Sequence, residues 1–297
     1  TRALSGAGSG SGNEVTSSVL ASVRQSSITA TGPVTINAAE AGRIDATTGS
    51  LGIALNVGSG TGAKVGVGLG IAVTLNDVTA SAIAESEDTS INAGTQDVSI
   101  TADNTASIDS TAFGVSLSVS TSQSGASVGV SANVAVSLND INLETRALVT
   151  DTAGGDSDSV VAGDLTVSAT DSGNITADAT SVGLAVSSSS SSVSVSGAVN
   201  VSVADNTITS TTEALIDSVD ATLGGAVDMD ASSEKVITAI VTAASVGVSL
   251  GSGSGASASL TGAGSRSYNE TTNSVLAVIR NADVTATGDV TLDAVDS

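Results

Sequence analysis

Aliphatic residues alternate with small or polar residues along most of this chain. In the clearest run, one face holds Val65, Val67, Leu69, Ile71, Val73 and Leu75, and the other holds Lys64, Gly66, Gly68, Gly70, Ala72 and Thr74. A period of two is typical of a β-strand with one face buried. The pattern therefore predicts long strands around a core of Val, Ile and Leu ladders. No segment carries the pattern of a helix.

Segments rich in Gly and Ser separate consecutive alternating runs. Examples are Gly58–Gly62, Ser187–Ser192 and Gly251–Gly255. Gly and Ser adopt turn conformations that bulkier residues resist. These segments are therefore predicted to be the tips at which the chain reverses between two long strands.

The alternating runs belong to an internal repeat, and an Asn opens each unit. The Asn positions are 13, 76, 139, 206 and 269, so the interval is constant except for a slightly longer third one. A short signature of the type Gly288-Asp-Val-Thr-Leu-Asp-Ala294 recurs later in each unit. Regular spacing of this kind indicates one continuous repeat array over residues 1–297. Its units are 13–75, 76–138, 139–205, 206–268 and the partial unit 269–297.

A longer period lies on top of the short one. Asn13–Arg24 returns as Asn269–Arg280, an offset of 256 that equals four short units. We therefore expect the chain to begin and end inside a longer array that repeats this block. The third unit is longer because of the insertion Asp151–Ser159. Such an insertion usually maps to a surface loop.

The predicted fold is an all-β, repetitive parallel β-solenoid, or β-helix, with long Gly/Ser-tipped hairpin-like excursions. Two arrangements fit the repeat. Each unit could supply about three rungs of roughly 20 residues, stacked about 4.8 Å apart. Alternatively, the signature segments form the solenoid and the alternating pairs stand beside it as antiparallel hairpins. The small-residue face either fits a crowded inner corner or a solvated surface, or packs laterally against another sheet.

Composition limits how such a fold can be stabilised. Aromatic residues are 1% of the chain, with Phe113, Tyr268 and no Trp, so large aromatic side chains cannot build the core. Hydrophobic residues nevertheless make up 40% and charged residues only 13%. Disordered chains combine low hydrophobicity with high charge. The composition therefore indicates a folded chain built around small aliphatic side chains.

The charge and the missing residue types exclude several functions. The formal net charge of −22 opposes binding to nucleic acid and to anionic membrane surfaces. No stretch has the pattern of a transmembrane helix, so we expect no insertion into a membrane. His and Cys are both absent. Without the usual general base and thiol nucleophile, the chain is predicted not to be an enzyme, and no catalytic or cofactor-binding residue is assigned.

Calcium is the one ligand for which the sequence offers candidates. Asp151, Asp156 and Asp158 place three carboxylates close together in the inserted loop, beside flexible glycines. Calcium prefers six to eight oxygen ligands in such flexible surroundings. The alternative is a solvated acidic loop without a metal.

The repeat pattern resembles giant bacterial β-repeat adhesins, the filamentous-haemagglutinin-like and leukotoxin-family filamentous adhesins. The resemblance rests on segments such as Gly288–Ala294, on Ile44-Asp-Ala46 and Ile175-Thr-Ala177, and on Ala126–Val130. It implies an extracellular or outer-membrane-associated fibre and brings no catalytic residues.

We therefore expect an extracellular structural filament or adhesin-stalk segment on the bacterial cell surface. It would self-associate end-to-end or laterally, with a host or environmental surface as a further partner. The alternative is a binding module whose solenoid loops recognise glycan, ice or mineral surfaces.

Overall fold

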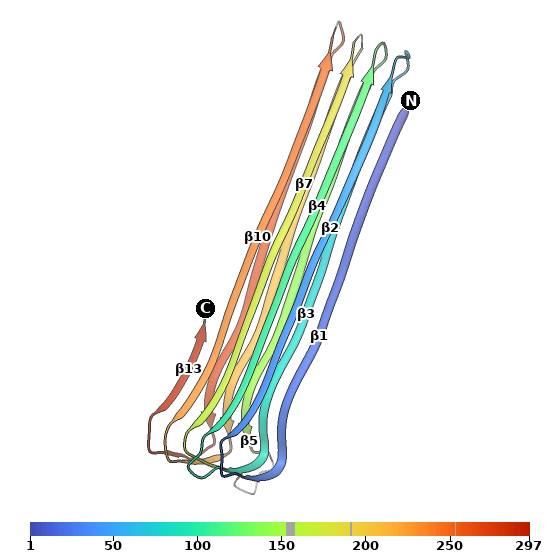
Figure 1. The fold of residues 1–297 in the computed structure, drawn as a ribbon. Coiled ribbons are helices and arrows are strands. Elements are labelled where there is room, and N and C mark those ends of the chain that lie inside the picture. The colour runs from blue at the N-terminus through green and yellow to red at the C-terminus, as the bar shows by residue number, and fades with distance from the viewer. Residues whose placement is uncertain (153–157, 191, 253) are drawn as a thin grey trace.

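The computed structural model describes residues 1–152, 158–190, 192–252 and 254–297, and the regular structure in these residues is all β-strand (Figure 1). The long strands are β1 (Arg2–Thr29), β2 (Val34–Gly58), β3 (Lys64–Asn92), β4 (Val98–Ser122), β5 (Ser127–Thr150), β7 (Leu165–Ser189), β8 (Ser194–Asp217), β10 (Val227–Gly251) and β11 (Ser257–Arg280). The short strands are β6 (Ser159–Ala162), β9 (Asp220–Leu223), β12 (Val284–Ala286) and β13 (Val290–Asp296).

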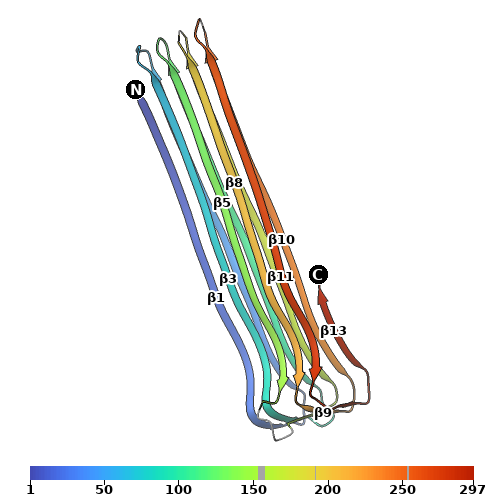
Figure 2. The same ribbon diagram turned by 180° about the vertical axis from the view of Figure 1, so that it is seen from behind.

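The strands form two parallel sheets that lie back to back (Figures 1 and 2). Sheet I contains β1, β3, β5, β8 and β11 in spatial order, with the short strands β6, β9 and β12 at its lower end. Sheet II contains β2, β4, β7, β10 and β13. Each coil runs down one strand of sheet I, turns at the base, returns along a strand of sheet II and crosses over at a tip. The predicted parallel β-solenoid is confirmed.

Of the two arrangements that fitted the sequence, three short rungs per repeat is wrong, because each repeat forms a single coil. Asn13 pairs with Asn76, and Asn76 pairs with Asn139, so residues one full repeat apart are neighbours in the sheet. The alternation continues through a whole strand such as β2 without a corner-forming break, and one long strand results. The Gly/Ser tips join strands of opposite sheets, such as β2 to β3, and therefore form arches and not hydrogen-bonded hairpins.

In the coils that begin with β1, β3, β8 and β11, the base turns at a residue with left-handed backbone conformation. These residues are Gln25, Asp88, Ser218 and Asn281, with φ between 48° and 62°. Asn and Asp tolerate this region better than most other residues. The chain then crosses the base in short parallel strands, in which Val160 pairs with Ile91 of β3 and with Ala221 of β9. The coil is thus a long, narrow loop closed by a short base and a tip.

The two ends of the loop differ in what lies between the sheets. We call residues 1–12, 48–75, 112–138, 179–204 and 241–268 the distal arm, and the remaining residues the base. In the base, large aliphatic side chains point inward and form the core predicted from the sequence. These side chains include Ile36, Ile44, Val78, Ile91, Ile100, Ile108, Ile141, Leu143, Leu165, Ile175, Ile208, Ile216 and Met229.

In the distal arm the predicted orientation was wrong, because the small residues point inward and the aliphatic residues point to solvent. The buried inward residues include Gly52, Ala54, Gly66, Gly68, Ala72, Ser116, Ser118, Ser120, Ser131, Ala135, Ser181, Ala185, Ser196, Ala198 and Ser202. The Gly/Ala/Ser face does pack against another sheet, but that sheet is the other side of the same coil.

Close approach of the two sheets explains the inversion. A Cβ atom at Gly52 would overlap the carbonyl group of Leu69, and one at Gly129 would lie 2.8 Å from the carbonyl oxygen of Val186. Ser118 Oγ donates a hydrogen bond of 2.8 Å to the carbonyl oxygen of Gly66 across the interior. Backbone of one sheet therefore contacts backbone of the other, and a Val or Leu side chain has no room between them.

The Asn residues that open the repeats form a ladder at the level where arm and base meet. Each side-chain Nδ2 donates to the Oδ1 of the next coil, at 2.8, 2.8, 2.7 and 2.8 Å from Asn13 through Asn269. The three central residues, Asn76, Asn139 and Asn206, are buried. Stacked amides satisfy one another only when successive coils stay in register. The ladder thus accounts for the regular spacing of Asn in the sequence.

Gly52→Ala is expected to destabilise the chain by about 1–3 kcal/mol, because the added methyl group forces the two sheets apart. Gly262→Ala is the matched control, since a Cβ there meets nothing within 4 Å. The urea midpoint of both variants measures the effect. Equal midpoints would contradict the close approach of the sheets.

Asn139→Ala is expected to cost about 1–3 kcal/mol, because Asn76 and Asn206 each lose a buried hydrogen-bond partner. Asn269→Ala removes only the last member of the ladder, which is exposed, and should cost less. Thermal unfolding followed by circular dichroism compares the two variants. A larger loss for Asn269→Ala than for Asn139→Ala would argue against a structural ladder.

Candidate functional site

The outer surface of sheet II in the distal arm is an apolar face four strands wide. Its members are Leu51, Ile53, Leu55 and Val57 of β2, Phe113, Val115, Leu117 and Val119 of β4, Val182, Leu184 and Val186 of β7, and Val246, Val248 and Leu250 of β10. The register stacks them in columns, such as Ile53, Leu117, Leu184 and Val246. Leu55 is 60% exposed and Leu250 is 56% exposed. We call this surface the sheet II apolar face.

Sheet I carries a second apolar surface, which is three strands wide. It includes Val65, Val67, Leu69, Ile71, Val73 and Leu75 of β3, Val128, Val130, Val134, Val136 and Leu138 of β5, and Val195, Val199, Val201 and Val203 of β8. In β1 the corresponding outward positions are mostly glycine, as at Gly8, whereas in β11 Gly262 and Gly264 lie between Leu260 and Arg266. The surface on sheet I is therefore a ridge that is flat on its β1 side.

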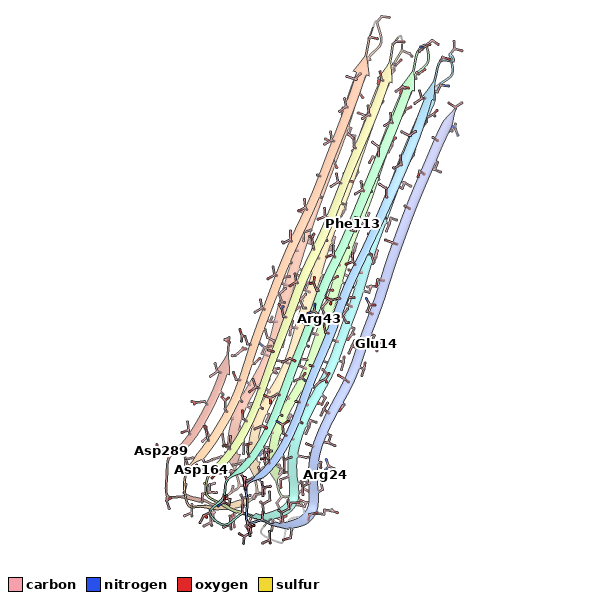
Figure 3. The ribbon with its side chains drawn as sticks, viewed as in Figure 1. Glu14, Arg24, Arg43, Phe113, Asp164 and Asp289 are labelled. Atoms are coloured by element: carbon pink, nitrogen blue, oxygen red, sulfur yellow. The ribbon has the colours of Figure 1, made fainter. Side chains whose placement is uncertain are left out.

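Charge is segregated between the two ends of the molecule. All 30 acidic residues belong by sequence to the base, and the arm contains only three basic side chains, Arg2, Lys64 and Arg266. With five of the eight basic residues, the base carries −25 and the arm +3, which together give the net −22. In Figure 3 Phe113 lies high on the strands, whereas Asp289 lies at the lower end. One end is uncharged over most of its surface, and the other is strongly acidic.

An acidic row marks the lower border of the ridge on sheet I. A hollow of about 580 Å³ lies there, lined among others by Glu14, Asp77, Asp140 and Asp205. Asp77 and Asp140 are directly paired in adjacent strands. Burial raises the pKa of Asp140, and the negative charge of Asp77 raises it further. Like charges stacked in register thus oppose each other at this border.

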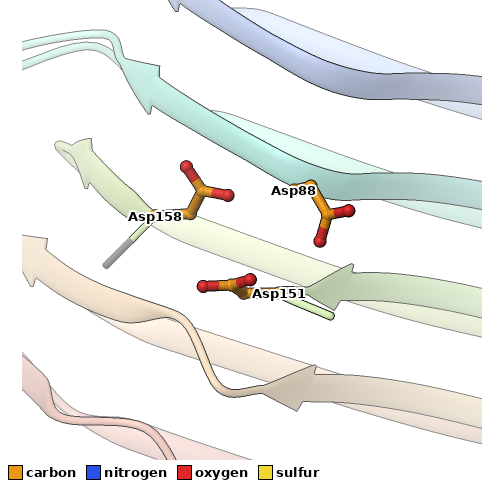
Figure 4. A group of neighbouring side chains, drawn as sticks. All are labelled: Asp88, Asp151 and Asp158. Carbon is orange, nitrogen blue, oxygen red and sulfur yellow. The ribbon is translucent and has the colours of Figure 1, made fainter. Parts of the chain in front are cut away.

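The predicted calcium ligands are brought together in part, at the base. Asp151 and Asp158 lie beside Asp88, with one carboxylate oxygen of each within 4.8 Å of the others (Figure 4). Asp156 lies outside the described residues. Asp88 accepts hydrogen bonds from the backbone and hydroxyl of Thr152, at 2.6 and 3.0 Å.

Asp88 was missed from the sequence, although the repeat contained a signal for it. Since Glu87 pairs with Thr150 in register, Asp88 and Asp151 occupy equivalent positions one repeat apart. Ser90 Oγ also donates to Asp158 Oδ1, at 2.9 Å. The same carboxylates that could bind calcium thus already cap backbone and hydroxyl groups at this corner. Calcium binding stays a prediction beside the alternative of a solvated acidic corner.

Comparison of the chain with protein-family models, with curated proteins and with solved structures finds no match. Among the described residues there is no helix of the length and apolarity needed to cross a bilayer.

If the cluster binds calcium, millimolar CaCl₂ should raise the melting temperature, because a ligand that binds only the folded state stabilises it. Asp158→Asn should abolish the rise by removing one carboxylate. Asp103→Asn, at an exposed position on the outer surface of sheet II, is the matched control. Melting curves in CaCl₂ and in EDTA make the comparison. An equal calcium effect in both variants would show that the ion binds elsewhere.

Proposed function

We propose that this chain is a segment of an extracellular structural filament. The observation that carries the proposal is the unbroken register of the coils. Between the second and third coils, β5 pairs with β3 along its entire length, and β7 pairs with β4 along its entire length. Backbone hydrogen bonds also continue around the turns, as from Gly225 to Gly163 and from Ser127 to Val193.

This pairing supports a mechanical role. A force along the solenoid axis acts along the hydrogen bonds that join one coil to the next. Both long ladders of a coil boundary carry that load together, so the boundary opens only when many bonds are lost at once or when one end peels. Parallel strands joined in this way leave only the two ends of the array as open edges. The same open edges are the surfaces for end-to-end association.

The shape of the coil favours a broad filament over a slender stalk. A long strand such as β2 spans about 80 Å, and each coil advances the axis by only about 4.8 Å. A repeat of 63 residues therefore lengthens the solenoid by only about 4.8 Å, which is about 13 residues for every ångström of axial length. A stalk that must extend far from the cell would need fewer residues per ångström of length, and short rungs would provide that. A broad ribbon of this kind suits a structure that presents surface.

The extracellular location rests on the acidic composition and on the resemblance to filamentous adhesins. A base with 30 acidic residues keeps adjacent ribbons soluble. Both features support the extracellular location, but neither bears on the mechanical role. The location and the filament therefore need separate measurements.

Cryo-electron microscopy and fibre diffraction of the native material test the filament. The expected result is a ribbon about 80 Å wide with a spacing of about 4.8 Å along its long axis, because the strands lie across it. Gold-labelled antibody against the base should decorate ribbons outside intact cells. Strands that run along the fibre axis, or label confined to the cell interior, would contradict the proposal.

A further inference from the structure

The sheet II apolar face is the exposed surface of this fold that most favours contact with another apolar surface. It is aliphatic in all four complete coils, whereas the ridge on sheet I is bordered by the glycine-rich strand β1 and by the acidic row at Asp77 and Asp140. The largest apolar patch on a typical soluble monomer covers about 300–600 Å² and is often functional. Four strands about 4.8 Å apart and eight residues of about 3.3 Å each give about 500 Å² for this face. In a longer array the face continues as a stripe.

We infer that the occupant of this face is a second copy of the chain, packed with its own sheet II apolar face against the first. The inference rests on the proposed filament, because contacts between ribbons deepen its structural role. Two such faces are flat and carry no charged side chain, so their Leu and Val side chains can interdigitate as in other packed sheets. Such an interface is isologous, with the same residues contributed by both copies.

The distribution of charge also fixes the orientation of the two copies. If both tips pointed the same way, two bases of −25 would lie side by side. If the tips point in opposite directions, only the arms overlap and the bases lie about 40 Å apart, beyond the screening length of about 8–10 Å. The opposite orientation therefore brings the apolar faces together and keeps the acidic ends separate. We assign the arm-over-arm arrangement with opposed tips.

A lipid bilayer fits the face less well than a second copy does. Proteins that sit in bilayers place Trp and Tyr at the level of the headgroups. On the sheet II apolar face Phe113 is the only aromatic residue, and the border toward the base carries Thr111, Asp109 and Asp178. The acidic base is also repelled by anionic lipid. These features favour the protein partner.

The area predicts how tightly two copies bind. About 500 Å² on each partner is less than the roughly 800 Å² of a standard interface, so this segment alone should dimerise at micromolar concentrations or weaker. Each further four-unit block of the longer period would add the same area. Lateral contacts that are weak for one block thus become strong along a filament.

Sedimentation velocity of the full chain over a concentration series tests the inference. The unmodified chain should show a monomer–dimer equilibrium. Leu55→Glu and Leu250→Glu, both on the sheet II apolar face, should each weaken dimerisation at least about tenfold, because a carboxylate cannot be buried there without a partner. Ile71→Glu is the matched control on sheet I, where Ile71 is 51% exposed, and should leave dimerisation unchanged. Matching urea midpoints show that all three variants fold.

Small-angle X-ray scattering of the dimer tests the orientation. Opposed tips give a maximum dimension of about 120 Å, and tips on the same side give about 80 Å. The shorter dimer, or one sensitive to Ile71→Glu and not to Leu55→Glu, would overturn the assignment. So would a chain that stays monomeric, or one that floats with phosphatidylcholine vesicles unless Leu55 is replaced. None of these results bears on the axial strand spacing, which tests the filament separately.

Discussion

In-register parallel pairing is the constraint on which the rest of this structure depends. Because each residue lies beside its equivalent from the next coil, every position in the repeat becomes a column along the axis. Columns of Asn satisfy one another's hydrogen bonds, as Asn76 and Asn139 do. Columns of Asp repel, which is why the pKa of Asp140 is raised beside Asp77 in addition to the effect of burial. Each outward residue of one repeat thus becomes part of a row of equivalent residues that runs along the axis of the array.

The second constraint is the separation of the two sheets, which divides each strand into halves of opposite character. In the base, Ile and Leu fill the interior and supply the hydrophobic stabilisation. In the arm, Gly, Ala and Ser bring the sheets together, and bonds such as Ser118 to Gly66 replace apolar burial. The aliphatic residues of the arm are consequently left outside. The arm gains little from burial within one chain and depends on its backbone ladders and on the base.

Much of the fold could be predicted from the sequence, but the side on which each residue lies could not. The regular return of Asn indicated the repeat, and the alternation indicated the strands. The three-rung arrangement made each coil too short. It placed extra turns within a repeat, whereas the chain turns only at the Gly/Ser tips and at base corners such as Asp88. Alternation also cannot say which face is inside. The informative signal was that small residues occur at matching places on both sides of a coil, such as Gly52 and Gly68, which only a close approach of two sheets requires. Of the candidate calcium site, Asp151 and Asp158 could be found in the inserted loop, whereas Asp88 becomes visible only through the register.

In the proposed filament, segregation of charge would allow the array to stay soluble and still associate laterally. The acidic base would repel other bases, an effect that falls off within about 10 Å. In the proposed contact the apolar face of one arm packs against that of another, and the contact area would grow with every block added. In the proposed contact the bases lie about 40 Å apart, so their repulsion is screened at any length, whereas the apolar contact would grow with the array. On this proposal a longer array associates more strongly than a short one, and the position of the apolar face decides that it does so through its arms.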